Sequence, residues 1–284
     1  MARKNGWQWA EVHGDATPYG MPHLWGRAQW DADALRDALR PYVAEHLGAP
    51  QAVLVVDETG LLKTGQPSVG VARHESGTAG RVDNCQLGVC LTSAGPHGHV
   101  LLDRASALPQ EWTNDVARGK GAGIPAERLC ATKPPRAQQM LQRAFDPGVP
   151  AAWVTGERVY GDHRSLRLGL EAQCHAQVLA VSGKADVWRA GRQHQVTTIL
   201  AALAAAGWWR LSAGDGAKGP RASDWQWLPL AAPLQPHWRR WLLVRRSVSD
   251  PTELTAYGGG CPAYDRAGNR RAGGRPPLDR CTVL

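Results

Sequence analysis

The chain has 284 residues, enough for one large domain or two small ones around a sizeable core. Hydrophobic residues make up 43% and charged residues 20%, which excludes disorder throughout the chain. No window approaches the roughly 18 continuous apolar residues of a membrane helix, and no apolar run of a signal peptide follows the basic start. The net charge of +8 suits a polyanionic partner, although many basic proteins have none.

Residues 1–50 are expected to form an entry segment with one helix. Asp31 is a candidate N-cap, and apolar residues recur at helical spacing over residues 34–47. Gly48 and Pro50 then end the helix.

The next part of the chain is typical of a sheet. Residues 52–57 form a short, continuously apolar segment rich in β-branched side chains, a pattern that predicts a strand buried on both faces. Three more strand-like segments follow with short connections, at 68–74, 85–92 and 99–103. Such an order without a helical crossover predicts an antiparallel meander.

Helices and strands then alternate. Residues 135–145 carry apolar side chains on one side of a predicted helix, and a buried strand follows at 151–155. Asp162 starts a second predicted helix, and another strand follows at 177–181. This order predicts a mixed α/β sheet flanked by helices, with the later strands parallel to the first.

The last third of the chain is less regular. Residues 184–236 are interpreted as an insertion, with a helix candidate at 197–206 and a loop at 214–219. A last strand is predicted at 238–246. From residue 258 the sequence is rich in Gly, Arg and Pro, so 258–284 is expected to be a disordered tail.

Two acids follow buried strands. Asp57 ends the first strand and Glu157 follows the strand at 151–155. In open α/β sheets sites form beyond the carboxyl ends of strands, so the two carboxylates meet there if the strands are neighbours. Such a pair is stabilised by a hard divalent cation such as Mg²⁺, which supports phosphodiester chemistry. For each acid the alternative is a helix N-cap or a solvated loop residue, and Glu58 and Asp162 are competing neighbours.

The amino-acid sequences of several segments give more specific information. The strings are VLVVDETG (53–60), SVGVAR (68–73), SGTAGRVDNCQLGV (76–89), EWT (111–113), ATKP (131–134), WVTGERVYG (153–161) and DPTEL (250–254). In this order they resemble the IS701-type insertion-sequence transposases, over residues 3–257. The resemblance implies a ribonuclease-H-like fold, a D-D-E triad of metal-binding carboxylates, and Mg²⁺-dependent cleavage and joining of DNA ends in bacteria.

The resemblance assigns roles to two acids. Asp57 matches the first acid, and Glu157 takes the place of the second, which is Asp in the family. Glu keeps the charge but moves the oxygens outward by one methylene. Asp57 and Glu157 are therefore the expected catalytic residues and ligands of Mg²⁺ or Mn²⁺.

The third acid of the family is a Glu on a helix beyond the DPTEL segment, and this chain has no Glu after Glu253. The family is apolar where the chain reads Gly258-Gly-Gly, so we hypothesise a frameshift after Tyr257. The resemblance also implies a shortened start, because the family usually has a further N-terminal region before the position where this chain begins. The expected organisation is an entry segment at 1–50, a ribonuclease-H-like core at 51–257 with its insertion, and the tail.

Other patterns favour a function less specifically. Six scattered Cys lack a C-x-x-C pair, which is typical of buried thiols in a reducing cytoplasm. Three histidines have no metal-ligand spacing: His74, His163 and His194. Three basic residues suit either phosphate contacts or a solvated loop: Lys63, Arg73 and Arg81. Trp238–Arg246 mixes Trp and Arg, which suits a nucleic-acid surface or a strand with one wet face. Ser165 and Cys130 lack the framing of a hydrolase nucleophile.

The sequence thus predicts a truncated DDE transposase in the bacterial cytoplasm, acting on insertion-sequence ends of DNA, as a possible homodimer and without a membrane. Because the third carboxylate is missing, we expect little or no transposition by this chain, with rescue by Asp250 or Glu253 improbable. The alternatives are a non-catalytic DNA-binding remnant that competes with intact transposase, or a decayed fragment without function.

Overall fold

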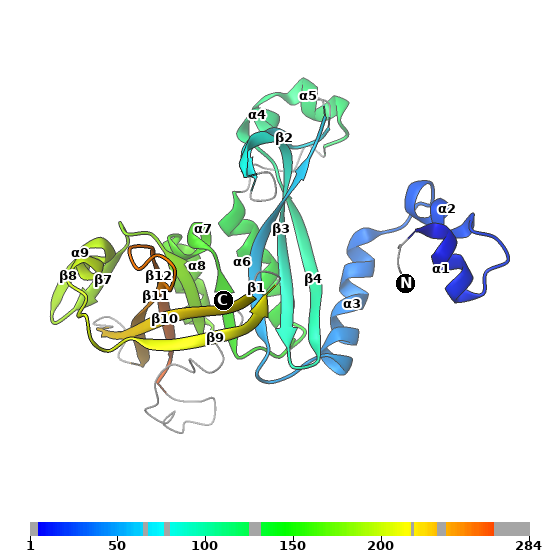
Figure 1. Ribbon diagram of the computed structural model, residues 1–284. Coiled ribbons are helices and arrows are strands. Elements are labelled where there is room, and N and C mark those ends of the chain that lie inside the picture. The colour runs from blue at the N-terminus through cyan, green and yellow to red at the C-terminus, as the bar shows by residue number, and fades with distance from the viewer. Residues whose placement is uncertain are drawn as a thin grey trace. The chain divides into compact units, whose positions relative to one another are not determined.

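The computed structural model describes residues 5–64, 68–76, 80–124, 132–216, 219–231 and 237–263. The chain divides into two compact units, Met1–Leu39 and Arg40–Leu284 (Figure 1). The division falls inside α3 (Ala32–His46), earlier than the boundary at residue 50 that the sequence suggested.

The smaller unit contains helices that the sequence analysis did not predict. They are α1 (Gly6–His13), which Asn5 caps by accepting a hydrogen bond from Gln8 N, and α2 (Gly20–Gly26). The expected single helix, α3, is present and Asp31 caps it as predicted, because its Oδ1 accepts two backbone N–H groups of the first turn. The entry segment therefore has three helices rather than one.

The described strands of the larger unit form a ten-stranded sheet in the order β2-β3-β1-β5-β6-β12-β11-β10-β9, with β4 paired to β3 (Figure 1). Their bounds are β1 Val53–Leu62, β2 Val71–Ser76, β3 Arg81–Gly95, β4 Gly98–Ala107, β5 Trp153–Gly156, β6 Gln177–Val181, β9 Trp209–Gly216, β10 Gly219–Leu230, β11 Trp238–Ser247 and β12 Leu254–Pro262. The strands β1, β5 and β6 run parallel to one another, and the remaining pairs are antiparallel. The prediction of a mixed α/β sheet is confirmed.

Helices of this unit pack on one face of the sheet. They are α6 (Lys133–Phe145), α7 (Arg158–Gly161), α8 (Arg164–Ala172) and α9 (Val196–Ala201). Under them Leu54 and Val56 of β1 are 0% and 1% exposed, together with buried Met140 of α6. Two short helices, α4 (Gln110–Asn114) and α5 (Val116–Gly121), lie beside β2, where Trp112 Nε1 donates to the Val71 carbonyl at 2.8 Å.

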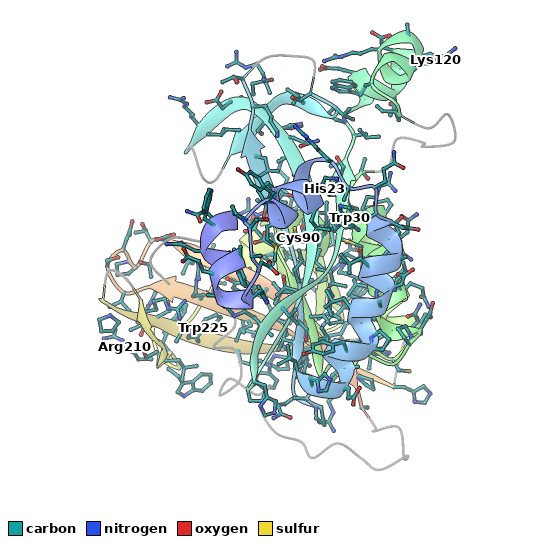
Figure 2. The ribbon with its side chains drawn as sticks, turned by 90° about the vertical axis from the view of Figure 1, so that its right-hand side faces the viewer. His23, Trp30, Cys90, Lys120, Arg210 and Trp225 are labelled. Atoms are coloured by element: carbon teal, nitrogen blue, oxygen red, sulfur yellow. The ribbon has the colours of Figure 1, made fainter. Side chains whose placement is uncertain are left out.

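The opposite face carries an aromatic cluster. Trp225, Trp241 and Tyr257 are buried there with Val178 and Leu243, and partly buried Trp153, Trp209 and Trp227 surround them. The Trp153 and Trp241 rings meet edge to face at 6.0 Å between centroids. Figure 2 shows Trp225 toward one end of the sheet, Cys90 in its middle and Lys120 on α5 at the other end. Several of the chain's 13 Trp therefore serve as core residues.

The expected disordered tail does not begin at residue 258. Gly258–Gly260 lie within β12, which pairs with β6 on one side and β11 on the other. The Trp241 ring occupies the space that a Cβ at position 259 would need. Glycine therefore has a packing reason at this position, and its presence does not by itself mark the end of the folded region. Residues 264–284 lie outside the described residues.

The region 184–236 is also more regular than expected. It contains the hairpin β7 (Asp186–Arg189) and β8 (Arg192–Gln195), and β9 and β10 extend the main sheet. Helix α9 ends at Ala201, before the predicted end at residue 206. Aromatic residues favour strands, and the Trp-rich segments here were not recognised as such.

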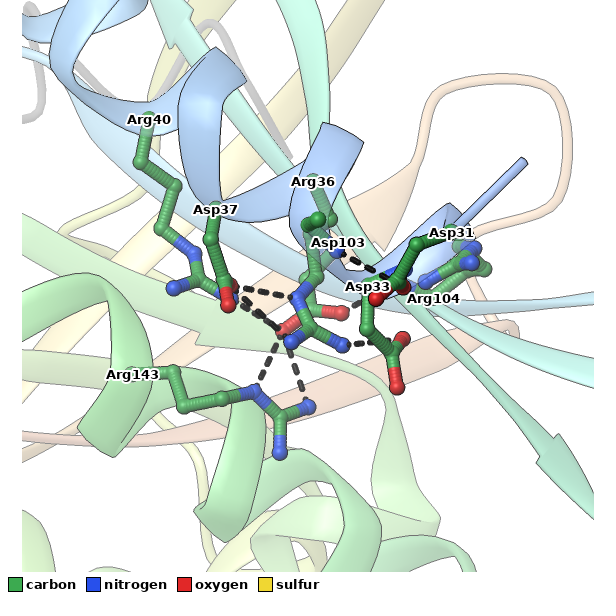
Figure 3. A network of polar contacts seen from close by, with 9 residues as sticks. Asp31, Asp33, Arg36, Asp37, Arg40, Asp103, Arg104 and Arg143 are labelled. Carbon is green, nitrogen blue, oxygen red and sulfur yellow. Dashed lines mark hydrogen bonds and ion pairs between the residues drawn. The ribbon is translucent and has the colours of Figure 1, made fainter.

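A buried carboxylate joins two helices to β4. Asp103 is 1% exposed, and Arg143 of α6 donates to its Oδ2 through two nitrogens at 2.9 Å (Figure 3). Arg40 of α3 approaches the same oxygen at 3.5 Å, and the Arg104 backbone N–H donates to Oδ1. This network satisfies a charge that would be costly to bury alone.

We expect Gly259→Ala to destabilise the protein, because the added Cβ collides with the Trp241 indole inside a paired strand. Overpacking of this kind costs about 1–3 kcal/mol, so the Tm in thermal unfolding should fall by several degrees. Gly121→Ala in α5 is the control, since nothing lies within 4 Å of a Cβ there. Equal Tm values for the two variants would show that β12 is not packed as described.

Candidate active site

The register between β1 and β5 places two acids at one edge of the sheet. The parallel pairs run from Val53 opposite Trp153 to Val56 opposite Gly156. Asp57 and Glu157 each follow the last of these pairs, on neighbouring strands whose backbones are about 4.8 Å apart. The expectation that Asp57 ends its strand is wrong, because β1 continues to Leu62 through its pairing with β3. Both residues are exposed, so the apolar runs end where the acids reach solvent.

Glu157 occupies the N-cap position of α7 without acting as a side-chain cap. Its carbonyl oxygen accepts from the N–H groups of Tyr160 and Gly161, at 3.0 and 3.1 Å, but its carboxylate makes no capping hydrogen bond. The short helix packs closely against β6, because Gly161 has no Cβ to collide with the Ala180 carbonyl oxygen. The helix start therefore leaves the Glu157 carboxylate available for another role.

Three carboxylates lie near one another here, because Glu58 follows Asp57 on β1 and Glu157 follows the paired end of β5. Partial burial raises the pKa of Glu157 above its usual range, and the negative charges of Asp57 and Glu58 raise it further. Lys133 and Arg158 lower the pKa of Glu157 but do not cancel these effects. The site therefore carries an excess of negative charge, and a bound cation would reduce the repulsion between its carboxylates.

Glu58 is held by a lysine that sequence reasoning missed. Lys133 Nζ, at the start of α6, donates to Glu58 Oε1 at 2.7 Å, and both side chains are about one quarter exposed. Glu58 pairs with fully buried Val89 of β3, whereas Asp57 pairs with Cys90. Because side chains alternate along a strand, Glu58 lies on the helix-covered face and Asp57 on the other. The Thr-Lys-Pro segment at the start of α6 was the sequence feature that could have pointed to this lysine.

Tyr160 and Cys90 complete the surroundings. Tyr160 is 0% exposed, and burial followed by the charges of Glu58, Asp57 and Glu157 raises the pKa of its hydroxyl. The Cys90 thiol is partly buried beside Asp57, and burial raises its pKa although a hydrogen bond with Thr59 opposes the shift. Tyr160 follows Glu157 by three residues, and the sequence analysis gave it no role.

The competing acids have structural partners. Asp162 Oδ1 accepts the backbone N–H of Ser182 at 2.9 Å, which fastens the segment after α7 to the end of β6. Asp250 Oδ1 accepts from Thr252 N and Oγ1, which lowers the pKa of Asp250 and shapes the turn before β12. These bonds explain both acids without a catalytic role.

The remaining candidates are dispersed. Arg81 pairs with Asp83 at 2.9 Å, and His163 shares a hydrogen bond with Ser165. Burial and then Lys133 lower the pKa of His74. The other residues singled out lie on separate elements or loops, at Lys63, Arg73 and His194, and Cys130 lies outside the described residues. The described ranges contain no set of three His, Cys, Asp or Glu side chains arranged to hold a metal ion. They also contain no helix long and apolar enough to cross a membrane.

We expect Glu157→Gln to raise the Tm of the metal-free protein near neutral pH. A raised carboxyl pKa means that the protonated form favours folding, so this stability is present below the usual pKa of about 4.3 and is lost as the pH rises through the raised value. Thermal unfolding in EDTA should therefore separate the variant from wild type at about pH 7 but not at about pH 4. Glu11→Gln on α1 is the control, and an unchanged Tm of Glu157→Gln at both pH values would contradict the coupling.

A comparison with known protein families matches most of the chain. Residues 9–241 match the family model described as DDE superfamily endonuclease, a range that includes Asp57 and Glu157. A search of curated proteins finds no match to the chain. The match covers most of the chain and indicates a transposase-like nuclease domain of a class that acts on DNA. The chain belongs to the DDE superfamily endonucleases.

Proposed function

We propose that this chain is an IS701-type DNA transposase whose Asp57 and Glu157 hold Mg²⁺ or Mn²⁺ during cleavage and joining of DNA ends. The observation that carries the proposal is the register of β1 and β5, which brings the two acids to one sheet edge. The free Glu157 carboxylate at the α7 N-cap supports it, because the usual structural role of such an acid is not used.

The strand order supports a ribonuclease-H-like core. β1 pairs antiparallel with β3, and β3 pairs antiparallel with β4. On the other side of β1, β5 pairs parallel with β1 and β6 pairs parallel with β5, after the crossovers that contain α6 and α8. The proposed ribonuclease-H-like core therefore has the strand order β4-β3-β1-β5-β6. In this reading β7 to β10, which follow β6, form the insertion before β11 and β12.

The donor chemistry fits a hard divalent cation. Carboxylate oxygens are the ligands that Mg²⁺ and Mn²⁺ prefer, and partial burial followed by the charges of Asp57 and Glu58 raises the pKa of Glu157. When bound, the ion would lower the pKa of a water molecule and stabilise charge on the phosphate. Asp57 and Glu157 would hold it, while the Lys133 ion pair with Glu58 keeps part of the local charge balanced.

The third carboxylate limits the activity that we propose. The turn with Asp250 and Glu253 precedes β12, which runs antiparallel to β6, so it lies at the same edge as the end of β6. Between β1 and β12 stand β5 and β6, which separates the backbones by about 14 Å. Neither acid therefore replaces the missing ligand directly, and we propose that this chain transposes DNA weakly or not at all.

A DNA-binding remnant that competes with intact transposase is the alternative, favoured by the net charge of +8. Salt-dependent affinity for DNA without cleavage would distinguish it from an active nuclease. A broad, non-cooperative thermal transition would instead favour a decayed fragment.

Asp57→Asn should weaken the binding of Mn²⁺ by at least about tenfold, because it removes one charged ligand and keeps the side-chain shape. Isothermal titration calorimetry of both proteins measures the change. Asp186→Asn on β7 is the matched control and should bind Mn²⁺ as wild type does. If Asp57→Asn and wild type have the same Kd, Asp57 is not a ligand and the proposed function fails.

Glu157→Asp should bind Mn²⁺ more tightly than wild type, by about threefold or more, because it moves the oxygens back by one methylene to the position the family uses. Glu157→Gln should bind more weakly, since it loses the charge. The order Asp, Glu, Gln in affinity is the expected outcome of the titrations. An order with Asp weaker than Glu would show that this site is adapted to the longer side chain.

A further inference from the structure

Two polar atoms beside the site are buried without a partner. The Tyr160 hydroxyl and Glu58 Oε2 each make no hydrogen bond among the described residues. Buried polar groups normally find a partner in the protein or in an ordered water molecule, so each of these atoms needs an explanation. A water molecule needs two or more polar partners, and two such atoms near one another can supply them.

The geometry places Tyr160 next to Glu58. The Tyr160 ring lies over Gly156, because its Cδ2 is 3.3 Å from the position of a Cβ there. Gly156 pairs with Val56, and Val56 and Glu58 lie on the same face of β1. Glu58 is also the carboxylate that most strongly raises the pKa of Tyr160. Lys133 holds the other oxygen of Glu58 from the start of α6.

Glu58 in turn holds Asp57. The backbone N–H of Glu58 donates to Asp57 Oδ1 at 2.7 Å. The pairing of β1 with β3 holds the Glu58 backbone, and the side-chain contacts of Glu58 on the helix-covered face add support to the N–H that orients Asp57. Groups that orient a ligand in this way influence the affinity of a site although they never touch the ion.

We propose that Lys133, Glu58 and Tyr160 form a positioning network for Asp57, in which one water molecule joins the Tyr160 hydroxyl to Glu58 Oε2. Glu58 is then a positioning residue and not a metal ligand. The inference rests on the proposed function, because it takes Asp57 as the ligand that is oriented.

Tyr160→Phe tests the network without changing any charge. We expect the variant to melt several degrees below wild type in EDTA and to bind Mn²⁺ about tenfold more weakly in calorimetry. If the hydroxyl has no partner, its removal instead leaves the Tm unchanged or raises it, because a buried unsatisfied group is lost. That result, or an unchanged Mn²⁺ Kd, would overturn the proposal.

Tyr42→Phe is the matched control, since Tyr42 lies on α3 with 58% of its surface exposed, and both readouts should stay at wild-type values. A second arm uses Glu58→Met, which removes the acceptor. In that background Tyr160→Phe should lower the Tm no further, whereas additive losses would show that the two side chains are independent.

The two proposals can fail separately. If Asp57→Asn leaves Mn²⁺ binding unchanged, the proposed function fails, and the metal-free double-variant comparison still decides whether Tyr160 and Glu58 are joined. If Asp57→Asn abolishes binding while Tyr160→Phe leaves it intact, the metal site stands and the positioning network is rejected.

Discussion

The candidate site depends on one constraint, the parallel pairing of β1 with β5. With Val56 opposite Gly156, the two acids that follow reach the same edge of the sheet. The close approach of Gly161 to the Ala180 carbonyl holds α7 against β6, and the Tyr160 ring then covers Gly156. The result is a set of neighbouring carboxylates whose partial burial and mutual repulsion raise the pKa of Glu157. Such an arrangement costs stability in the free protein and suits a site that takes up a cation.

Helix α6 links this edge to the interior. Its first residue, Lys133, binds Glu58, while Arg143 near its other end binds buried Asp103 on β4. Buried Met140 and Ala144 pack against the sheet beside these contacts. The thirteen residues of the helix span about 20 Å, so one rigid element connects the carboxylates to the salt-bridge network (Figure 3). A change that shifts α6 is therefore expected to be felt at Glu58.

The two faces of the sheet are built differently. One face is covered by helices over aliphatic residues, and the other carries the aromatic cluster around Trp225 and Trp241. On the aromatic face the size of the indole rings dictates the neighbouring residues, as Gly259 under Trp241 shows. Gly259, in the segment that suggested out-of-frame translation, thus has a packing reason, and the same rings are a reason why β9 and β10 belong to the sheet.

Much of the core was predictable because local patterns agreed with the final structure. Continuous apolar residues indicated β1 and β6, helical periodicity indicated α6, and the acids after the apolar runs indicated the candidate pair Asp57 and Glu157. By contrast, glycine disfavours strands, so β12 could not be recognised before its pairing with β6 and β11 was known. The sequence by itself determined which acids follow the buried apolar runs, because apolar runs and their boundaries are local. Only the tertiary structure decided that Lys133, 75 residues from Glu58, binds that acid and that the Tyr160 ring covers Gly156. The physical reason is that adjacent residues of a strand face opposite sides, and the helix packed on one side chooses the partner.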